Sequence, residues 1–283
     1  MKHFFIKATT IIFFFLLFIF LFYNNEVYAG ELNHGIYYAS LNDSQKEIYN
    51  EVYDNMMAYN EATFKLPHPI VYDELRLIMN SVYNDHPEIF WVRTAYRYGL
   101  KSDGTITQLK LRYCVDKKDL EEAKLLFDSV IEIVIEKAAN CETTLEKEKI
   151  IHDVICDITK YDLENDKNQS AYSSLVEGSS ICAGYSRAFQ VCCNRLGIDC
   201  YYVLGETNIE EHAWNIVNID GVYYNVDITS DDVMNEAYGF HTYEYFNVSD
   251  EKLAKTHKRD TVSEFLPKCT QNLLFSNILY YFL

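Results

Sequence analysis

Residues 179–229 decide the fold, and they read SSICAGYSRAFQVCCNRLGIDCYYVLGETNIEEHAWNIVNIDGVYYNVDIT. The first part predicts a helix over residues 181–196, because Ser179 or Ser180 can cap its beginning and Gly197 can end it. The alternating apolar residues that follow predict three strands, over residues 199–205, 212–219 and 222–229.

The dipeptide Asp220-Gly221 predicts a two-residue turn between the last two strands. Such a turn pairs Ile219 with Val222, and further along it pairs Trp214 with Asp227. Side chains alternate along a strand, so one face of the hairpin would carry His212, Trp214, Tyr223, Asn225 and Asp227. Asp227 is then the diagonal neighbour of His212, within reach of its imidazole. A shift of one residue would place the two side chains on opposite faces.

Cys182 falls in the first turn of the predicted helix. The free backbone N–H groups there and the positive end of the helix dipole favour a thiolate. The small residues Ala183 and Gly184 would let a second chain approach the sulfur. On position alone, Cys182 is the only one of the eight cysteines with a physical reason to be reactive. The alternative is a structural cysteine at a helix start.

His212 and Asp227 form the other half of the candidate site. A carboxylate beside an imidazole can hold it in one tautomer and stabilise its charged form. The alternative is an incidental polar pair across two strands. The combination of a thiol at a helix start with a histidine and an acid that point the same way favours catalysis over that alternative.

The other seven cysteines have no pattern of their own. Export would permit disulfides, but the spacing is not that of a small disulfide scaffold, and the lack of a CxxC pair argues against zinc. If Cys182 stays a free thiol, at least one more cysteine is unpaired. Most of them are expected to be small buried apolar side chains: Cys114, Cys141, Cys156, Cys192, Cys193, Cys200 and Cys269.

The composition indicates a globular protein with an acidic surface. The 283 residues suffice for one large domain or two small ones, and 49% of them are hydrophobic, which argues against extended disorder. Asp and Glu number 42 against 25 Lys and Arg, a net charge of -17. Because such a surface repels phosphate backbones, we expect no nucleic-acid partner.

Residues 1–29 have the pattern of a signal peptide. Two lysines precede an apolar stretch over residues 11–22, and Val27-Tyr28-Ala29 matches a cleavage site. We therefore expect a secreted, extracellular protein. The alternative is an uncleaved anchor over residues 8–25 that holds the protein at a membrane or cell surface, facing outside.

Helical periodicity and strand-like patterns predict a helix-rich N-terminal region with a small hairpin over residues 30–140. We find no chemistry in it. The expected helices lie at 43–60, 70–84 and 118–139, and the expected strands at 89–98 and 105–114.

A fourth helix is predicted over residues 144–160, opened by Thr144. His152 and Asp153 lie beside its apolar stripe, and a lone histidine of this kind is expected at the surface or rim. The apolar tail over residues 271–283 could be a terminal strand or an altered C-terminus, which the sequence leaves open.

Three separated motifs together resemble the transglutaminase-like core domain, in its bacterial secreted branch. The likeness covers about residues 145–270, within a core that we place at 141–270. It implies a papain-like α+β fold, with the nucleophile helix packed on an antiparallel sheet. It also implies a triad in which Cys182 is the nucleophile, His212 the general base and acid, and Asp227 the orienting carboxylate. The motifs are Ile181-Cys182-Ala183-Gly184-Tyr185-Ser186, His212-Ala213-Trp214-Asn215 and Val226-Asp227-Ile228-Thr229.

The resemblance implies acyl transfer through a thioester on Cys182, with the backbone N–H of that residue as one oxyanion donor. With water as the acceptor, the enzyme is a peptidase or amidase that acts on protein, peptide or cell-wall peptide substrates. With an amine such as lysine it is a cross-linking transglutaminase, and a third alternative is a catalytically silent binding module. Of the three, we expect the hydrolase. We also expect no cofactor and no metal, because no acidic cluster has a calcium-loop pattern and Asp231-Asp232 is expected to be a strand-end turn.

Overall fold

The computed structural model describes residues 35–165, 167 and 169–273. The expected signal peptide or anchor lies outside the described residues. Within them, no helix has both the length and the apolar character that a membrane span requires. The chain from Ile36 onward forms one compact unit, and everything below concerns that unit.

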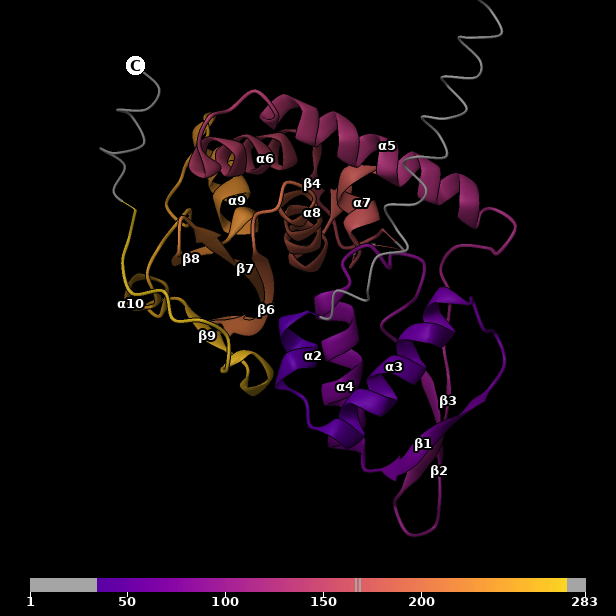
Figure 1. The fold of residues 1–283 in the computed structure, drawn as a ribbon. Helices are drawn as coiled ribbons and strands as arrows, with labels where there is room; N and C mark the ends of the chain where they lie inside the picture. Colours follow the sequence, from indigo (N-terminus) through magenta and orange to yellow (C-terminus); the bar gives the residue numbers. More distant parts are fainter. Residues whose placement is uncertain (1–34, 166, 168, 274–283) are drawn as a thin grey trace, which may run out of the picture. The chain divides into compact units, whose positions relative to one another are not determined.

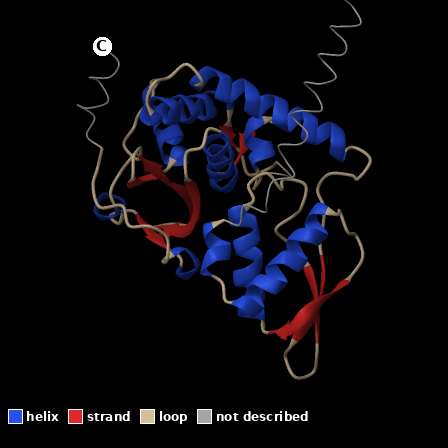
Figure 2. Ribbon diagram, in the orientation of Figure 1, coloured by secondary structure: helices blue, strands red, loops and turns tan. Residues whose placement is uncertain are grey.

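The first part of this unit is rich in helices, and its strands form a small separate sheet (Figures 1 and 2). The sheet has the strand order β1-β3-β2. A hairpin is therefore present, and its second strand lies within the predicted range. The predicted first strand is largely wrong, because β2 shares only residues 97 and 98 with it, and β1 was not predicted. The elements are α2 (Ile36–Ser40), α3 (Asp43–Met57), β1 (Phe64–Ile70), α4 (Tyr72–Asp85), β2 (Arg97–Leu100), β3 (Ile106–Lys110) and α5 (Leu120–Ala138).

The second part contains the elements that the sequence marked as decisive. Its four-stranded antiparallel sheet has the order β8-β7-β6-β9. The elements are α6 (Thr144–Ile158), β4 (Lys160–Tyr161), α7 (Ala171–Leu175), β5 (Ser179–Ser180), α8 (Cys182–Arg195), β6 (Cys200–Thr207), β7 (Glu211–Ile219), β8 (Val222–Val226), α9 (Ile228–Tyr238), α10 (Asp250–Leu253), β9 (His257–Arg259) and the 3₁₀ helix η2 (Thr261–Ser263).

The predicted hairpin register is confirmed over the length of β8. Ile219 pairs with Val222, and the ladder continues in that register to Asn215 and Val226. The predicted length of the last strand is wrong, because it ends at Val226 instead of residue 229. Asp227 adopts an extended conformation and caps the next helix, so residues 228 and 229 are helical.

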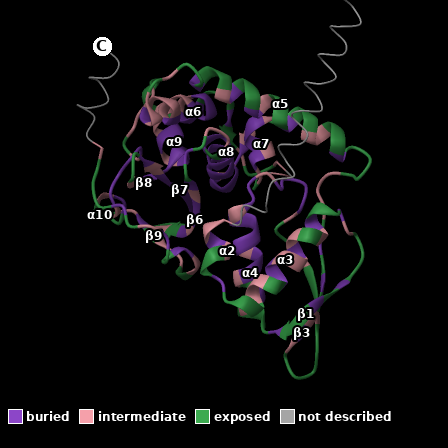
Figure 3. Ribbon diagram, in the orientation of Figure 1, coloured by how far each residue is buried: buried purple, intermediate pink, exposed green. Residues whose placement is uncertain are grey.

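Helix α8 packs against the four-stranded sheet and is enclosed by helices on its other sides (Figure 1). Of its 14 residues, only the last two are not buried, and Figure 3 shows it as the buried helix of the unit. The α+β fold with a helix packed on an antiparallel sheet is thus confirmed. The cap prediction is wrong by one residue, because Ile181 is the N-cap and makes no side-chain cap hydrogen bond.

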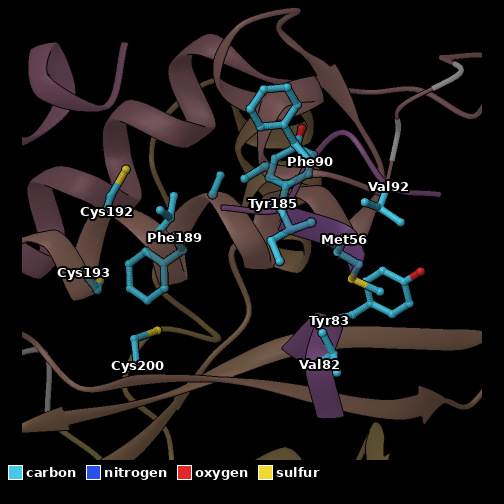
Figure 4. Packing of buried hydrophobic residues seen from close by; sticks show 14 of the residues in the cluster. Met56, Val82, Tyr83, Phe90, Val92, Tyr185, Phe189, Cys192, Cys193 and Cys200 are labelled. Atoms are coloured by element: carbon cyan, nitrogen blue, oxygen red, sulfur yellow. The ribbon is translucent and has the colours of Figure 1, made fainter. Parts of the chain in front are cut away.

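One apolar core joins the two parts of the unit. Figure 4 shows side chains from α3 and α4, such as Met56 and Val82, beside Tyr185 and Phe189 of α8. Helix α6 adds its own stripe to this core and begins with a capping box, in which Thr143 and Glu146 bond each other's backbone N–H groups. This core holds α8 in place, with Cys182 buried at its N-terminal end.

Candidate active site

Cys182 is the first helical residue of α8. Because Ile181 supplies no side-chain cap, the N–H groups of Cys182 and Ala183 remain available to an anion, whereas that of Gly184 donates to the Ile181 carbonyl at 2.9 Å. The side chain lies against Ala213 of β7 and Tyr202 of β6, and only 8% of the residue is exposed. Further along the helix, the Ser186 hydroxyl donates to the carbonyl of Ala213 and ties α8 to the same strand.

His212, at the beginning of β7, lies between the sulfur and a carboxylate. Its Nε2 is 2.9 Å from Asp227 Oδ2, and the Cys182 thiol lies near enough to help raise the pKa of the imidazole. Since Nε2 is engaged by Asp227, the Nδ1 atom is the one left for the sulfur. The structure therefore brings together all three residues that the sequence singled out.

Asp227 reaches His212 from a different local structure than we predicted. We expected it on a strand opposite Trp214, but it is the N-cap of α9, and its Oδ1 accepts a hydrogen bond from the backbone N–H of Ser230 at 3.1 Å. The Ser230 hydroxyl also donates to Oδ2. The cap fixes the carboxylate more firmly than a cross-strand contact would, because it is held by backbone as well as by side chains.

A second histidine, which the sequence analysis missed, shares the same carboxylate. His257 of β9 places Nε2 3.0 Å from Asp227 Oδ2, and its Nδ1 is 2.7 Å from the Thr256 hydroxyl. His257 is buried, and its ring centroid is 5.3 Å from that of His212. The only sequence signal was a histidine in a short strand, 30 residues beyond Asp227.

His212 and Asp227 shift each other's pKa. Burial by itself lowers the pKa of His212, but Asp227 and Cys182 outweigh it and raise that pKa to about 10. Burial likewise opposes ionisation of Asp227, yet His212 and His257 hold its pKa well below the usual range. The site therefore favours an imidazolium on His212 beside an ionised Asp227, the state that stabilises a neighbouring thiolate.

Trp214 and Gly205 form the wall behind the histidines. The Trp214 ring packs edge-on against His257, with centroids 5.2 Å apart, and its Nε1 donates to Asn225 Oδ1 at 3.2 Å. A Cβ atom on Gly205, which pairs with His212 in the sheet, would lie 2.4 Å from the Trp214 ring and from the carbonyl of Lys258. Only glycine therefore lets the ring approach the strand this closely.

A cavity of about 450 Å³ opens beside the two histidines. Its walls combine His212, His257 and the carboxylate side chain of Glu210 with apolar groups. The apolar lining comes from Tyr161, Ile209, Val233, Met234 and Tyr245. The size and mixed lining suit a peptide side chain or another small organic group.

His212, Asp227 and His257 are also the described residues that could together hold a metal ion, since one ligand atom of each lies within 4.8 Å of the others. Both imidazole Nε2 atoms, however, already make hydrogen bonds to Asp227. These contacts account for the cluster without an ion. That the protein needs no metal stays a prediction.

The expectation that His152 lies at the surface or rim is wrong. The residue is fully buried, with Nδ1 3.0 Å from Asp153 Oδ1 and Nε2 3.3 Å from Asp231 Oδ2. Asp231 and Asp232 are not a strand-end turn either, because both lie in the first turn and a half of α9 and are buried. The Tyr185 hydroxyl donates to Asp232 Oδ2 at 2.7 Å. These residues tie α6, α8 and α9 together.

All eight cysteines are free thiols in the structure. Six of them are buried, and Cys193 and Cys200 contact each other in the core beside Phe189 (Figure 4). Among the eight, Cys182 alone is placed at the beginning of a helix. Cys182 is also the cysteine that contacts His212.

Residues 132–228 match the family model described as the transglutaminase-like superfamily. This segment is a transglutaminase-like domain. The matched range includes all three candidate triad residues, and it supports a cysteine-dependent enzyme or a binding module on the same fold. His257 lies beyond it. No curated protein matches the chain.

Solved structures with a local likeness to this chain differ widely from it. One, described as a TGase, has a TM-score of 0.37 and 16% identity over 77% of this chain and 64% of its own. A candidate cysteine protease from Cytophaga hutchinsonii has a TM-score of 0.33 and 16% identity over 48% of this chain and 61% of its own. A candidate protease from Parabacteroides distasonis has a TM-score of 0.30 and 11% identity over 45% of this chain and 29% of its own. The chain thus covers less than two thirds of each.

Proposed function

We propose that the protein is a secreted cysteine-dependent acyl-transfer enzyme, and that it acts as a peptidase or amidase. The observation that carries the proposal is the position of His212, which has the Cys182 thiol on one side and Asp227 Oδ2 at 2.9 Å on the other. A thiol at an uncapped helix start, an imidazole and an ionised carboxylate are the groups that thioester chemistry needs.

In the first half of the proposed reaction, the Cys182 thiolate attacks the carbonyl carbon of an amide. The first-turn N–H groups of α8, including that of Cys182, would stabilise the oxyanion that develops. The C–N bond then breaks, and the imidazolium of His212 gives its proton to the leaving amine. A thioester on Cys182 and a neutral His212 result.

In the second half, His212 takes a proton from a water molecule, and the hydroxide attacks the thioester carbonyl. The C–S bond breaks, the acid product leaves, and the proton on His212 restores the thiolate–imidazolium pair. Asp227 keeps the imidazole oriented through both steps and stabilises its charged form. His257 and Ser230 would in turn keep the carboxylate ionised and fixed.

The cavity beside the histidines supports a peptide substrate. Its apolar walls fit an apolar side chain next to the scissile amide, while Glu210 favours a substrate with a positive charge at the edge of the cavity. Proteins, peptides and the peptides of a cell wall all meet this description. Secretion, which rests on the pattern of residues 1–29, would bring the enzyme to such substrates outside the cell.

Transamidation is the second candidate function, and the charge of the chain favours it. An amine acceptor such as lysine is a cation, and the protein has a net charge of -17, with Glu210 in the wall of the cavity. A dansylated amine with a glutamine-rich acceptor protein tests this directly. Fluorescent labelling of the acceptor faster than its hydrolysis would replace the hydrolase with the transglutaminase.

Substrate profiling tests the proposed function as a whole. A peptide library and peptide fragments of cell wall are incubated with the wild type, with Cys182→Ala and with the control Cys141→Ala, which removes a thiol outside the site. We expect cleavage of amide bonds by the wild type and the control and none by Cys182→Ala. Equal cleavage by all three, or by none, would contradict the proposal.

A further inference from the structure

A second cavity, of about 230 Å³, is lined in part by Arg187 of α8 and shares no lining residue with the cavity at the candidate active site. It is walled on one side by residues 87–95, which follow α4, and on the other by Gln169, Ser170 and Arg187 of the transglutaminase-like segment. The cavity is therefore built by the two parts of the unit together.

The cavity contrasts in charge with the rest of the protein. The chain has a net charge of -17. The described residues that line this cavity nevertheless include Arg93, Lys167 and Arg187 and contain no Asp or Glu. Lys167 makes an ion pair with Glu177, which lies outside the lining. Because Lys167 is paired and Arg93 also interacts within the chain, Arg187 is the cation through which this wall would attract an anion.

Arg187 is the residue that points most directly to a ligand. Only 8% of it is exposed, and its guanidinium stacks on the Tyr202 ring, 4.3 Å from the centroid. Its Nη1 donates to the carbonyl of Gln169 at 3.0 Å and lies 3.3 Å from the Tyr202 hydroxyl, and both of these partners are neutral. No carboxylate of the described residues forms an ion pair with it.

Buried charges in proteins are normally paired, because an isolated one is costly to remove from water. Arg187 is buried, cationic and without a carboxylate partner among the described residues, and it forms part of the cavity wall. Its Nε and Nη2 groups have no recorded acceptor in that part of the chain. An anion in the cavity could accept from both at once, in the bidentate geometry that guanidinium groups favour.

The remaining walls restrict the kind of anion. Pro87, Ile89, Phe90 and Val92 present apolar surface to the same small space. Inorganic phosphate has no apolar part to cover these groups, whereas an organic carboxylate with an aliphatic stem satisfies both kinds of wall. The volume is below the range typical of drug-sized ligands, so the ligand is small.

We propose that this cavity is a binding site for a small organic carboxylate with an apolar stem, of about the size of one amino-acid residue. Arg187 receives the carboxylate, and the wall from Pro87 to Val92 covers the stem. The site does not depend on the proposed acyl transfer, although Tyr202 lies between Arg187 and Cys182 and contacts both.

Calorimetric titration of the Cys182→Ser variant tests the proposal without interference from turnover. The probes are N-acetyl-L-leucine, acetate and inorganic phosphate, each titrated at low and at physiological salt. We expect N-acetyl-L-leucine to bind at least tenfold more tightly than acetate or phosphate. Tighter binding of phosphate would overturn the assignment to a carboxylate, and no binding of any probe would overturn the site.

Three substitutions on α8 test the role of Arg187. Arg187→Met keeps the stem on Tyr202 but removes the charge, and we expect it to weaken N-acetyl-L-leucine binding at least tenfold. Arg187→Lys keeps the charge without the planar fork and should weaken binding less. The control, Arg195→Gln on the same helix, removes ion pairs with Asp128 and Glu132 of α5, away from the cavity, and should bind as the parent does.

A second pair of variants keeps the test decisive if a change at Arg187 prevents folding. Thr94 is exposed and lines the cavity. Thr94→Glu brings a carboxylate of the protein itself to the cavity, while Thr94→Gln has the same size without the charge. We expect N-acetyl-L-leucine to bind at least fivefold more weakly to Thr94→Glu than to Thr94→Gln. Equal binding to the two variants would overturn the proposal.

Discussion

Two clusters in this protein contain a cysteine, a histidine and an aspartate, and they differ in what surrounds the sulfur. The first is Cys182 with His212 and Asp227, and the second is Cys156 with His152 and Asp231. Both cysteines are 8% exposed, so burial does not distinguish them. What differs is the charge at each thiol.

Cys182 begins α8, whereas Cys156 lies in the last turn of α6. The positive end of a helix dipole favours a thiolate and the negative end opposes it. Burial and then the carboxylates of Asp232 and Asp231 raise the pKa of the Cys156 thiol well above its usual range. A histidine–aspartate contact therefore does not identify an active site by itself. The environment of the cysteine determines whether its thiol is reactive.

The strongest test of this comparison exchanges one histidine in each cluster for glutamine. His212→Gln removes the general base, so we expect kcat/KM to fall about 10³-fold with little change in melting temperature. His152→Gln removes the ionic partner of the buried Asp231 and leaves it the hydrogen bond from the Tyr245 backbone, so we expect a loss of about 3 kcal/mol in stability with activity retained. Thermal melts and kinetics on the best substrate from the profiling measure both.

Alkylation of the thiols gives an independent reading of the same pair of variants. Iodoacetamide at neutral pH, followed by peptide mass mapping, should label Cys182 much faster than Cys156 in the wild type. The preference should disappear in His212→Gln and persist in His152→Gln. Rapid labelling of Cys156, or the same rate for Cys182 in all three proteins, would show that the two clusters do not differ as argued.

The same comparison shows how far the sequence could lead. The position of Cys182 in the first helical turn and the hairpin register up to Val226 were predictable, because both depend on neighbours in sequence. The wrong strand end at Asp227 had a local signal too, since an aspartate before a polar run is a helix cap. We gave the alternating pattern more weight than the cap.

The contacts of His152 and His257 had no such signal. His152 meets Asp231 across 79 positions, and His257 reaches Asp227 only because β9 pairs with β6 at the edge of the sheet. Contacts of this kind depend on how whole elements pack, which one sequence does not specify. The second histidine of the site and the buried second cluster therefore emerged only from the structure.

Glu148 allows the electrostatics around the second cluster to be tested through stability. It lies one turn before His152 on α6, and burial raises its pKa from 4.5 to about 8, although a hydrogen bond from Asn247 opposes this. Because the pKa is raised in the folded state, the contribution of Glu148 to stability is complete below about pH 4.5. It is lost as the pH rises toward 8.

Glu148→Gln should therefore be more stable than the wild type at pH 8, by about 3 kcal/mol, and nearly equal at pH 5. The new amide can also donate to Asn247 Oδ1, which has no hydrogen-bond partner in the described structure. Urea unfolding at both pH values measures the difference, with the exposed Glu136→Gln as the control. A difference independent of pH would refute the assignment.

Within the first cluster, we expect His257 to act as a positioning residue that orients the carboxylate of Asp227. His257→Phe removes the hydrogen bond to Oδ2 at 3.0 Å, and we expect kcat to fall about tenfold with KM unchanged, since only the orientation of the carboxylate is lost. His257→Gln can still donate and should recover most of the activity. If both variants lower only the melting temperature, or if both raise KM alone, the residue has no such role.

Removal of metal ions should have the smallest effect of all. His212, Asp227 and His257 place ligand atoms within 4.8 Å of one another, so they could form part of a metal site. In the proposed reaction, however, His212 must gain and lose a proton. A metal ion bound to its Nε2 would hinder this, because it would replace the hydrogen bond to Asp227. We therefore expect that dialysis against a chelator changes kcat/KM less than twofold and that added zinc inhibits. Loss of activity on chelation with recovery on adding zinc would make this cluster a metal centre. The reactivity of Cys182 compared with Cys156 would then depend on the metal ion and not on the position of each cysteine in its helix.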